Sequence, residues 1–284
     1  MTFITRFAPS PTGQLHLGHA FSALLAFDMA QAAKGRFLLR IEDTDKTRCT
    51  DAFEAQIYAD LAWLGLTWET PILRQSDNTT AYESALVHLG DMGLLYPCSC
   101  TRGDIRRAAS APQEGAPMHG PDGLVYPGTC RHRPWKDRTE TDAVRLNMAR
   151  AVDSLEILPQ YPETGVHPAL RLTRAHLTDG VGDIVLARRD TKTAAYHLSV
   201  VVDDAAQDIT HVIRGQDLVT ATPIHVLLQA LLGYPTPTYH HHRLIRDSDG
   251  KRLAKRDDAR AIALFRQEGA TPLDIRSMVD LPTS

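Results

Sequence analysis

The chain of 284 residues contains only four cysteines, and no apolar run in it approaches the length of a membrane-spanning helix. Four cysteines, two of them in the tight pair Cys98-Ser-Cys100, are too few for a disulfide framework in a chain of this size. The N-terminus also lacks a basic segment followed by an apolar stretch, which is the pattern of a secretory signal. These absences argue against the membrane and disulfide-stabilised secreted classes, and we expect a cytoplasmic protein.

Positive charge is not in excess either, since the formal net charge is −3. Bulk charge therefore gives no indication of nucleic-acid binding. Basic residues nevertheless gather locally, and phosphate binding depends on local patches. Three groups flank segments with chemically active residues and favour a side that faces RNA over a merely solvated surface: Arg102, Arg106 and Arg107; Arg131, Arg133, Lys136 and Arg138; and Arg243, Arg246, Lys251, Arg252, Lys255 and Arg256.

The most informative segment lies near the N-terminus. A short apolar run from Phe3 to Phe7 leads through a Pro/Gly turn into a helical pattern that begins near His16. A strand, a tight turn and a helix N-terminus together form an anion site, because free backbone N–H groups and the helix dipole point at it. His16 and His19 share one edge of the first turn, and Gly18 lets a flat base approach the backbone. The pattern predicts a nucleotide site.

Two motifs in this chain resemble the signatures of class I aminoacyl-tRNA synthetases. His16-Leu-Gly-His19 resembles the HIGH motif, and Arg252-Leu-Ala-Lys-Arg256 resembles the KMSKS loop. The string Ala8-Pro-Ser-Pro-Thr-Gly13, followed by Arg40-Ile-Glu-Asp-Thr-Asp45, is similar to the glutamyl/glutaminyl subgroup. An HxGH alone is a weak signal, but this combination in this order is specific, and the resemblance spans Thr5 to Arg260.

Only Asp257 to Ser284 follow the KMSKS-like loop, where glutamyl-tRNA synthetases carry a large anticodon-reading region. In this respect the chain resembles the glutamyl-Q tRNA(Asp) synthetase family, which attaches glutamate to the queuosine base at the wobble position of tRNA(Asp). The resemblance implies a monomeric ligase that activates glutamate with ATP independently of tRNA. Its RNA partner would be the anticodon stem-loop of tRNA(Asp) carrying queuosine. Two alternatives stay open: a minimal glutamyl-tRNA synthetase that charges a tRNA 3′ end, and a catalytically silent tRNA-binding paralogue.

The expected fold is α/β, a doubly wound Rossmann-type parallel sheet with an inserted zinc-containing α+β domain and a short helical C-terminal segment. Apolar runs predict buried strands over 37–41, 196–202 and 209–213, and apolar spacing predicts helices over 51–65, 79–92 and 223–232. We expect the first half of the catalytic domain at 1–96, the inserted acceptor-binding-like domain at 97–190, the second half at 191–238, and the KMSKS-like loop with a short helical C-terminus at 239–284.

The resemblance also implies roles for individual residues in ATP activation. His16, His19 and Lys255 would be catalytic, although Lys255 alone could be a surface lysine. The loop departs from the family pattern at Arg252, Ala254 and Arg256, and Mg²⁺ would arrive mainly with the ATP. The implied ATP-binding set is Arg6, Phe7, Ala8, Pro9, Ser10, His16, Gly18, His19 and Lys255.

Recognition of glutamate requires cations for its carboxylates and an anion for its ammonium. The family pattern falls on Arg6 and Arg214 for carboxylate contacts, on Ser10 and Tyr196 as hydroxyl partners, and on Glu42 for the ammonium. Other interpretations stay open for two of these residues. Glu42 could pair only with a neighbouring basic residue, Arg40 or Lys46, and Tyr196 could be a core tyrosine.

Cysteines and histidines provide two further candidate sites. Cys98, Cys100 and Cys130 resemble the zinc site of some glutamyl enzymes, in which a tyrosine, here Tyr126, is the fourth ligand. His119 and His132 are rivals on chemical grounds, and reduced cysteines without metal are the simpler alternative. The run His240 to His242 alternates along a strand, and we expect a basic edge that faces nucleic acid.

Overall fold

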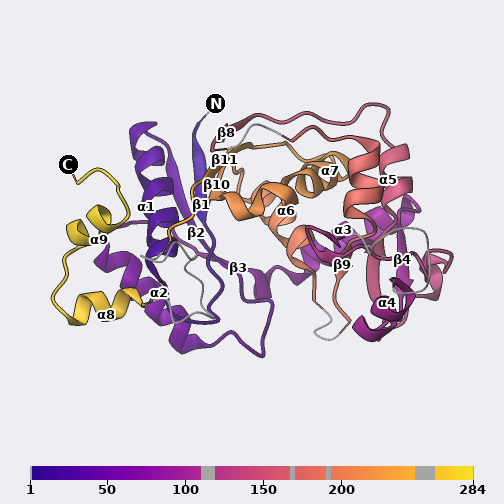
Figure 1. The fold of residues 1–284 in the computed structure, drawn as a ribbon, viewed down its shortest axis with the longest axis horizontal. Helices are drawn as coiled ribbons and strands as arrows, with labels where there is room; N and C mark the ends of the chain where they lie inside the picture. Colours follow the sequence, from indigo (N-terminus) through magenta and orange to yellow (C-terminus); the bar gives the residue numbers. More distant parts are fainter. Residues whose placement is uncertain (1, 110–118, 167–169, 190–192, 247–259, 284) are drawn as a thin grey trace.

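The computed structural model describes residues 2–109, 119–166, 170–189, 193–246 and 260–283 (Figure 1). The KMSKS-like residues, Lys255 among them, lie outside these ranges. Within them, no helix has both the length and the apolar character needed to cross a bilayer.

The N-terminal part alternates strands and helices around parallel pairs. Strand β1 (Ile4–Phe7) pairs with β2 (Arg36–Ile41), and β2 pairs with the short β3 (Leu73–Arg74). Thr50 begins one of the helices, because its side chain accepts a hydrogen bond from the Phe53 N–H at 3.2 Å. The predicted elements are confirmed within two residues, with helices α1 (Leu17–Ala32), α2 (Asp51–Trp63) and α3 (Thr79–Asp91).

A second set of parallel strands continues the fold beside β1. It has the order β10 (His211–Gly215), β11 (Thr238–His242) and β8 (Glu163–Gly165), and helix α7 (Thr222–Leu232) connects β10 to β11. Thr210 joins the two sets, since its N–H donates to the Ile4 carbonyl oxygen at 3.0 Å. The chain thus builds outward from β1 in one direction and from β10 in the other. Such a switch point is where open parallel sheets bind ligands.

Helices cover both faces of β1 and β2, which confirms the α/β fold with parallel sheets. Phe37 and Leu39 belong to a core shared with α1 and α2, whereas Leu38 belongs to a core shared with α3 and α7. The C-terminal helices α8 (Ile262–Gln267) and α9 (Pro272–Met278) add Phe265 and Ile275 to the first core, beside α1 and α2 (Figure 1).

The segment predicted as an inserted domain lies at the opposite end of the molecule from the C-terminal helices (Figure 1). Its three-stranded sheet is antiparallel, in the order β4-β7-β9. Strand β8 also comes from this stretch, but it pairs with β11 and so extends the parallel set. The other strands and α-helices described in this segment are β4 (Leu95–Cys98), α4 (Arg102–Ala109), β5 (His119–Gly120), β6 (Gly123–Leu124), β7 (Ala143–Leu146), α5 (Met148–Asp153) and β9 (Val185–Ala187).

One strand prediction was wrong. Residues 196–202 form the first part of helix α6 (Tyr196–Ala206), not a strand. All of its residues from His197 to Asp204 are buried, so the apolar run reflects burial on nearly every side. A short apolar run of this kind cannot distinguish a buried strand from a buried helix, and tertiary packing overrides the β-propensity of three consecutive valines.

Beneath the carboxyl ends of β1 and β2 lies a buried cluster of charges. Arg6 Nε and Arg40 Nη1 each donate to Asp204 Oδ1 at 2.8 Å, so one carboxylate of α6 binds both strands. The neighbouring Asp203 accepts hydrogen bonds from Gln75 Nε2, Asn78 Nδ2 and Tyr82 Oη at 2.7–2.8 Å. This cluster fixes α6 against β1, β2 and α3.

We therefore expect Asp204→Ala to lower the free energy of unfolding by about 3–5 kcal/mol, because it removes the carboxylate that two buried guanidinium groups share. Chemical denaturation followed by circular dichroism measures this. Glu69→Ala is the matched control, since Glu69 pairs with Arg36 at the surface, and its loss should cost less than about 1 kcal/mol. Equal losses in both variants would contradict a structural role for the cluster.

Candidate active site

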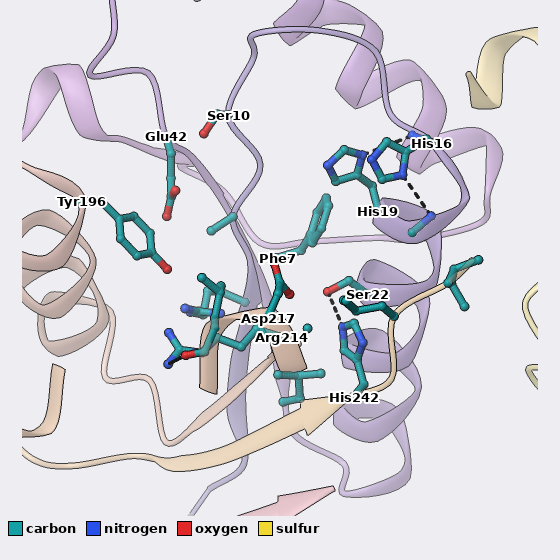
Figure 2. Close-up of a pocket in the computed structure, with 18 residues that line it drawn as sticks. Phe7, Ser10, His16, His19, Ser22, Glu42, Tyr196, Arg214, Asp217 and His242 are labelled. Carbon is teal, nitrogen blue, oxygen red and sulfur yellow. Dashed lines mark hydrogen bonds between the residues drawn. The ribbon is translucent and has the colours of Figure 1, made fainter. Parts of the chain in front are cut away.

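A cavity of about 590 Å³ opens at the carboxyl ends of β1, β2, β10 and β11, at the switch point (Figure 2). Pro9 does not line it but is buried beside it, where its carbonyl oxygen accepts a hydrogen bond from the Glu42 N–H at 3.1 Å. Lys255 lies outside the described residues. The cavity brings together all the other residues predicted for ATP and glutamate: Arg6, Phe7, Ala8, Ser10, His16, Gly18, His19, Glu42, Tyr196 and Arg214.

His16 and His19 hold the first turn of α1 by reciprocal capping. The Nδ1 of His16 accepts from the Gly18 N–H at 3.1 Å, and the Nδ1 of His19 accepts from the His16 N–H at 3.2 Å. A neutral imidazole whose Nδ1 accepts carries its proton on Nε2. Each ring is therefore a donor on the side away from the backbone, and the two ring centroids are 3.8 Å apart. Paired donors at a helix N-terminus suit a phosphate.

The ring of His16 leaves little room for a side chain at Gly18. A Cβ at this position would stand 3.0 Å from Cε1 and 3.1 Å from Nδ1 of His16. A side chain at position 18 would therefore require the His16 ring to shift by a few tenths of an ångström. The sequence interpretation was room for a flat base, and the structure adds the His16 ring as a second reason for a glycine.

Glu42 reaches the cavity from the end of β2. Arg40 Nη2 lies 3.8 Å from its Oε1, so Glu42 is a partner of Arg40 and also lines the cavity. Burial raises the pKa of Glu42 to about 7, although the charges of Arg40 and Arg6 act in the opposite direction. A cation that binds next to a carboxyl group with a raised pKa stabilises its ionised form, so this position favours a cationic ligand.

The opposite requirement holds at Arg214, at the end of β10. Arg214 is 5% exposed, and no carboxylate among the described residues forms an ion pair with its guanidinium. Arg6 differs, because Asp204 already accepts from its Nε and Nη2 at 2.8 and 3.3 Å. Figure 2 shows Tyr196 and Glu42 on the same side of the cavity as Arg214, with Phe7 between them and the two histidines. A buried cation without a carboxylate suits an anionic ligand.

Sequence reasoning missed several cavity residues, of which Ser22 and His242 are joined by a hydrogen bond of 3.0 Å (Figure 2). The sequence contained a signal for both residues. Ser22 lies one helical turn after His19, and His242 ends a parallel strand at the sheet edge where the cavity opens. The predicted exposed edge was wrong for His241 and His242, which are buried because β11 lies between β10 and β8. The other missed lining residues are Ile213, Gly215, Asp217, Leu218, Leu244 and Ile245.

The predicted cysteine site forms a compact group in the inserted segment. The Sγ atoms of Cys98, Cys100 and Cys130 all lie within 4.8 Å of one another. The Tyr126 hydroxyl is 3.4 Å from Cys98 Sγ and from Cys100 Sγ. Ligands of a tetrahedral zinc ion at Zn–S distances of about 2.3 Å stand about 3.8 Å apart, so the donor set fits zinc. Neither predicted rival, His119 nor His132, joins this group.

The surroundings also favour thiolate formation at one cysteine. Burial raises the pKa of Cys100 to about 11. At Cys130 burial acts in the same direction, but hydrogen bonds from Tyr126 and from the Ser99 backbone outweigh it and lower the pKa to about 7. Metal ligands must be deprotonated, so Cys130 is a more readily available ligand than Cys100. Cys49 lies outside this group.

The three basic groups differ in how much free charge they offer. Arg131, Arg133 and Arg138 are paired with Asp183, Asp142 and Glu83 at 2.7–2.9 Å, so most of the second group is neutralised. On α4 the side chains of Arg102 and Arg106 are exposed. In the third group Arg243 pairs with Asp280 at 3.0 Å, and residues 251–256 lie outside the described ranges.

Comparison with known proteins assigns the family. Residues 2–281 match the family described as tRNA synthetases class I (E and Q), catalytic domain. The chain is similar at 25% identity and a TM-score of 0.74 to a glutamate tRNA ligase from Elizabethkingia meningosepticum, solved in complex with its amino acid. The match covers 98% of this chain and 60% of that one. The chain therefore belongs to the class I tRNA synthetases of the glutamate and glutamine type.

Within that class, its relatives share one name. The chain is 58% identical over 286 residues to the Glutamyl-Q tRNA(Asp) synthetase of Rhodobacter capsulatus, across 98% of this chain and 100% of the relative. It is 42% identical to the Glutamyl-Q tRNA(Asp) synthetase of Nocardia farcinica, across 96% of this chain and 82% of the relative.

The raised pKa of Glu42 gives a prediction with a definite sign. Folding raises this pKa from 4.5 to about 7, so its contribution to stability is complete below pH 4.5 and disappears as the pH rises through 7. Between pH 5 and 8 the wild type should lose about 2–3 kcal/mol of unfolding free energy relative to Glu42→Gln. Denaturation curves at both pH values measure the difference. Parallel pH profiles would show that Glu42 is already ionised at pH 5.

Proposed function

We propose that this protein activates glutamate with ATP and transfers it to the queuosine base of tRNA(Asp). The observation that carries the proposal is the pairing of charges across one cavity. A buried Arg214 without a carboxylate and a Glu42 of raised pKa complement an amino acid with an anionic side chain and a cationic ammonium. The class I synthetase family and the relatives named Glutamyl-Q tRNA(Asp) synthetase support the reaction and the acceptor.

In this proposal glutamate binds between α6 and the ends of the strands. Glu42 accepts from the ammonium, which restores its ionised state. Arg214 and the Tyr196 hydroxyl bind the side-chain carboxylate, and Arg6 and Ser10 complete the carboxylate contacts at the end of β1. Glutamine would leave Arg214 facing a neutral amide that offers no countercharge, so discrimination by several orders of magnitude is attainable.

The histidine turn is assigned to the ATP phosphates. An oxygen of the glutamate α-carboxylate attacks the α-phosphorus, and pyrophosphate leaves. His16 and His19 donate from Nε2 to the phosphate oxygens on which charge develops, and the α1 N-terminus adds its dipole. The described residues contain one group of potential metal ligands, the cysteines, so Mg²⁺ would come bound to the ATP.

Lys255 is proposed as the further cation at the phosphates. The residues on either side of its segment support this role. Ile245 lines the cavity, and Ala261 forms a β-bridge with His16. The following Ile262 N–H donates to the Leu15 carbonyl oxygen at 2.8 Å. The segment that carries Lys255 therefore leaves and rejoins the described fold beside the histidine turn.

The acceptor tests this proposal. The enzyme alone should catalyse ATP–pyrophosphate exchange with glutamate and far less with glutamine. With ATP and glutamate, it should add glutamate to an anticodon stem-loop of tRNA(Asp) that contains queuosine, as read by nucleoside mass spectrometry. The same stem-loop with guanosine is the control and should remain unmodified.

Removal of the 3′-terminal adenosine separates this reaction from charging of a 3′ end. A full-length tRNA(Asp) with queuosine should still be labelled after that adenosine has been removed, because the proposed acceptor lies in the anticodon loop. Labelling only of tRNA(Glu), abolished when that RNA is oxidised first, would establish a minimal glutamyl-tRNA synthetase instead. Absence of exchange with every amino acid, both without tRNA and with tRNA(Asp) or tRNA(Glu) added, would establish the silent paralogue.

We also propose that Cys98, Cys100, Cys130 and Tyr126 hold one zinc ion. Zinc would supply a structural cross-link between the end of β4 and the turn at residues 126–130. None of these four residues lines the cavity, so the ion would have no part in the activation step.

Metal analysis of protein purified without chelators should find one zinc per chain. Cys98→Ser combined with Cys100→Ser should abolish it and lower the melting temperature by several degrees, because metal binding is linked to folding of the inserted segment. Cys49→Ser, the matched control, should keep both zinc and melting temperature. Wild-type protein without zinc would refute the site.

A further inference from the structure

Arg214 is held by imidazoles where a buried arginine is ordinarily held by carboxylates. Its Nη1 lies 3.0 Å from Nδ1 of His225, and its Nε lies 3.1 Å from Nε2 of His241. Its Nη2 donates to Thr222 Oγ1 at 2.7 Å and to the Leu218 carbonyl oxygen at 3.3 Å. These contacts occupy four of the five guanidinium N–H groups and leave one on Nη1 for a ligand.

The direction of each hydrogen bond follows from the arginine, which can only donate. His225 must accept at Nδ1, so its proton lies on Nε2, 3.0 Å from Nδ1 of His197. His197 in turn accepts at Nδ1 and donates from Nε2 to Asp122 Oδ1 at 2.7 Å. One consistent set of tautomers therefore links Asp122, His197 and His225 to Arg214.

The second side of Arg214 repeats the pattern with one histidine. His241 accepts from Arg214 at Nε2, so its proton lies on Nδ1, which donates to Glu163 Oε1 at 2.5 Å. Both chains end on a carboxylate, and both place neutral imidazole next to the guanidinium. His225 is 1% exposed and His241 is 0% exposed, so water does not compete for these bonds.

This arrangement separates orientation from neutralisation. A carboxylate in direct contact would orient Arg214 but would also cancel the charge that the glutamate side chain needs. An imidazole orients the guanidinium and leaves that charge in place. Burial, followed by the charge of Arg214, lowers the pKa of His225 well below 6.5, so the ring stays a neutral acceptor.

We propose that Asp122, His197 and His225 form a positioning relay that holds Arg214 in the orientation that binds the glutamate side chain. The relay rests on the proposed function, because that function assigns Arg214 to this carboxylate. Asp122 lies in the turn between β5 and β6, so a residue of the inserted segment helps to set amino-acid recognition in the parallel sheet.

Three variants test the relay by steady-state ATP–pyrophosphate exchange. His225→Phe removes the acceptor for Arg214 and should raise the KM for glutamate about tenfold or more, because a hydrogen bond to a charged group is lost. His225→Asn keeps an acceptor close to the Nδ1 position and should stay within about threefold of wild type. Asp122→Ala changes a side chain that is 45% exposed, so the fold should hold, and the KM for glutamate should rise about threefold to tenfold.

A purely structural role would affect both substrates, so the KM for ATP is measured in parallel and should stay within about twofold. His240→Asn is the control, since its ring binds Thr164 at 2.9 Å and has no bond to Arg214. Long-range ¹H–¹⁵N spectra of the wild type should show His197 and His225 protonated at Nε2 and His241 at Nδ1.

The outcomes separate the relay from the function on which it rests. A wild type without glutamate exchange would overturn the proposed function. Suppose that the wild type is active and that both variants, His225→Phe and Asp122→Ala, are folded. The relay is wrong if these variants keep the wild-type KM for glutamate, or if their KM for ATP rises as much as their KM for glutamate. The opposite tautomer at His225 would also overturn it.

Discussion

Electroneutrality of the buried charge cluster is the constraint on which the rest of this molecule depends. Arg6 and Arg40 share Asp204 and stand beside Asp203 and Glu42, so two cations face three carboxyl groups. Two carboxylates balance the two cations. The third carboxyl group, Glu42, has no cation of its own, and burial therefore raises its pKa. An ammonium group bound beside Glu42 completes the balance. The same contacts that join α6 to the sheet thus leave this cluster one positive charge short, while Arg214 lines the same cavity as a separate cation.

Much of this architecture was predictable because its signals are local. The strands β1 and β2 and the helices α1, α2 and α3 follow from apolar spacing and caps within short stretches of sequence. The histidine turn was predictable for the same reason, since the capping bonds join residues three positions apart or fewer. Arg6, Glu42 and Arg214 were placed together by the resemblance to the family, and the fold agrees because the carboxyl ends of parallel strands meet at one edge.

The features that could not be predicted from the sequence depend on contacts between distant segments, which no local pattern reveals. The valine run of α6 reads as a strand, and only its enclosure by neighbouring elements makes it a helix. His241 and His242 were expected at an exposed edge, but β8, a strand from a distant stretch, pairs with β11 and covers it. The role of Asp204 could not be predicted from the sequence, because its partners Arg40 and Arg6 lie 164 and 198 residues away.

The position of Asp122 has a thermodynamic consequence. The hairpin turn that carries it is packed against the segment that ends in β9, whereas the guanidinium at the other end of the hydrogen-bonded chain belongs to β10. Linkage between two binding events is reciprocal. Suppose that an RNA moves this hairpin on binding and thereby changes the affinity for glutamate by some factor. Bound glutamate must then change the affinity for that RNA by the same factor. The effect of the RNA on glutamate affinity and the effect of glutamate on RNA affinity are then given by one and the same coupling free energy.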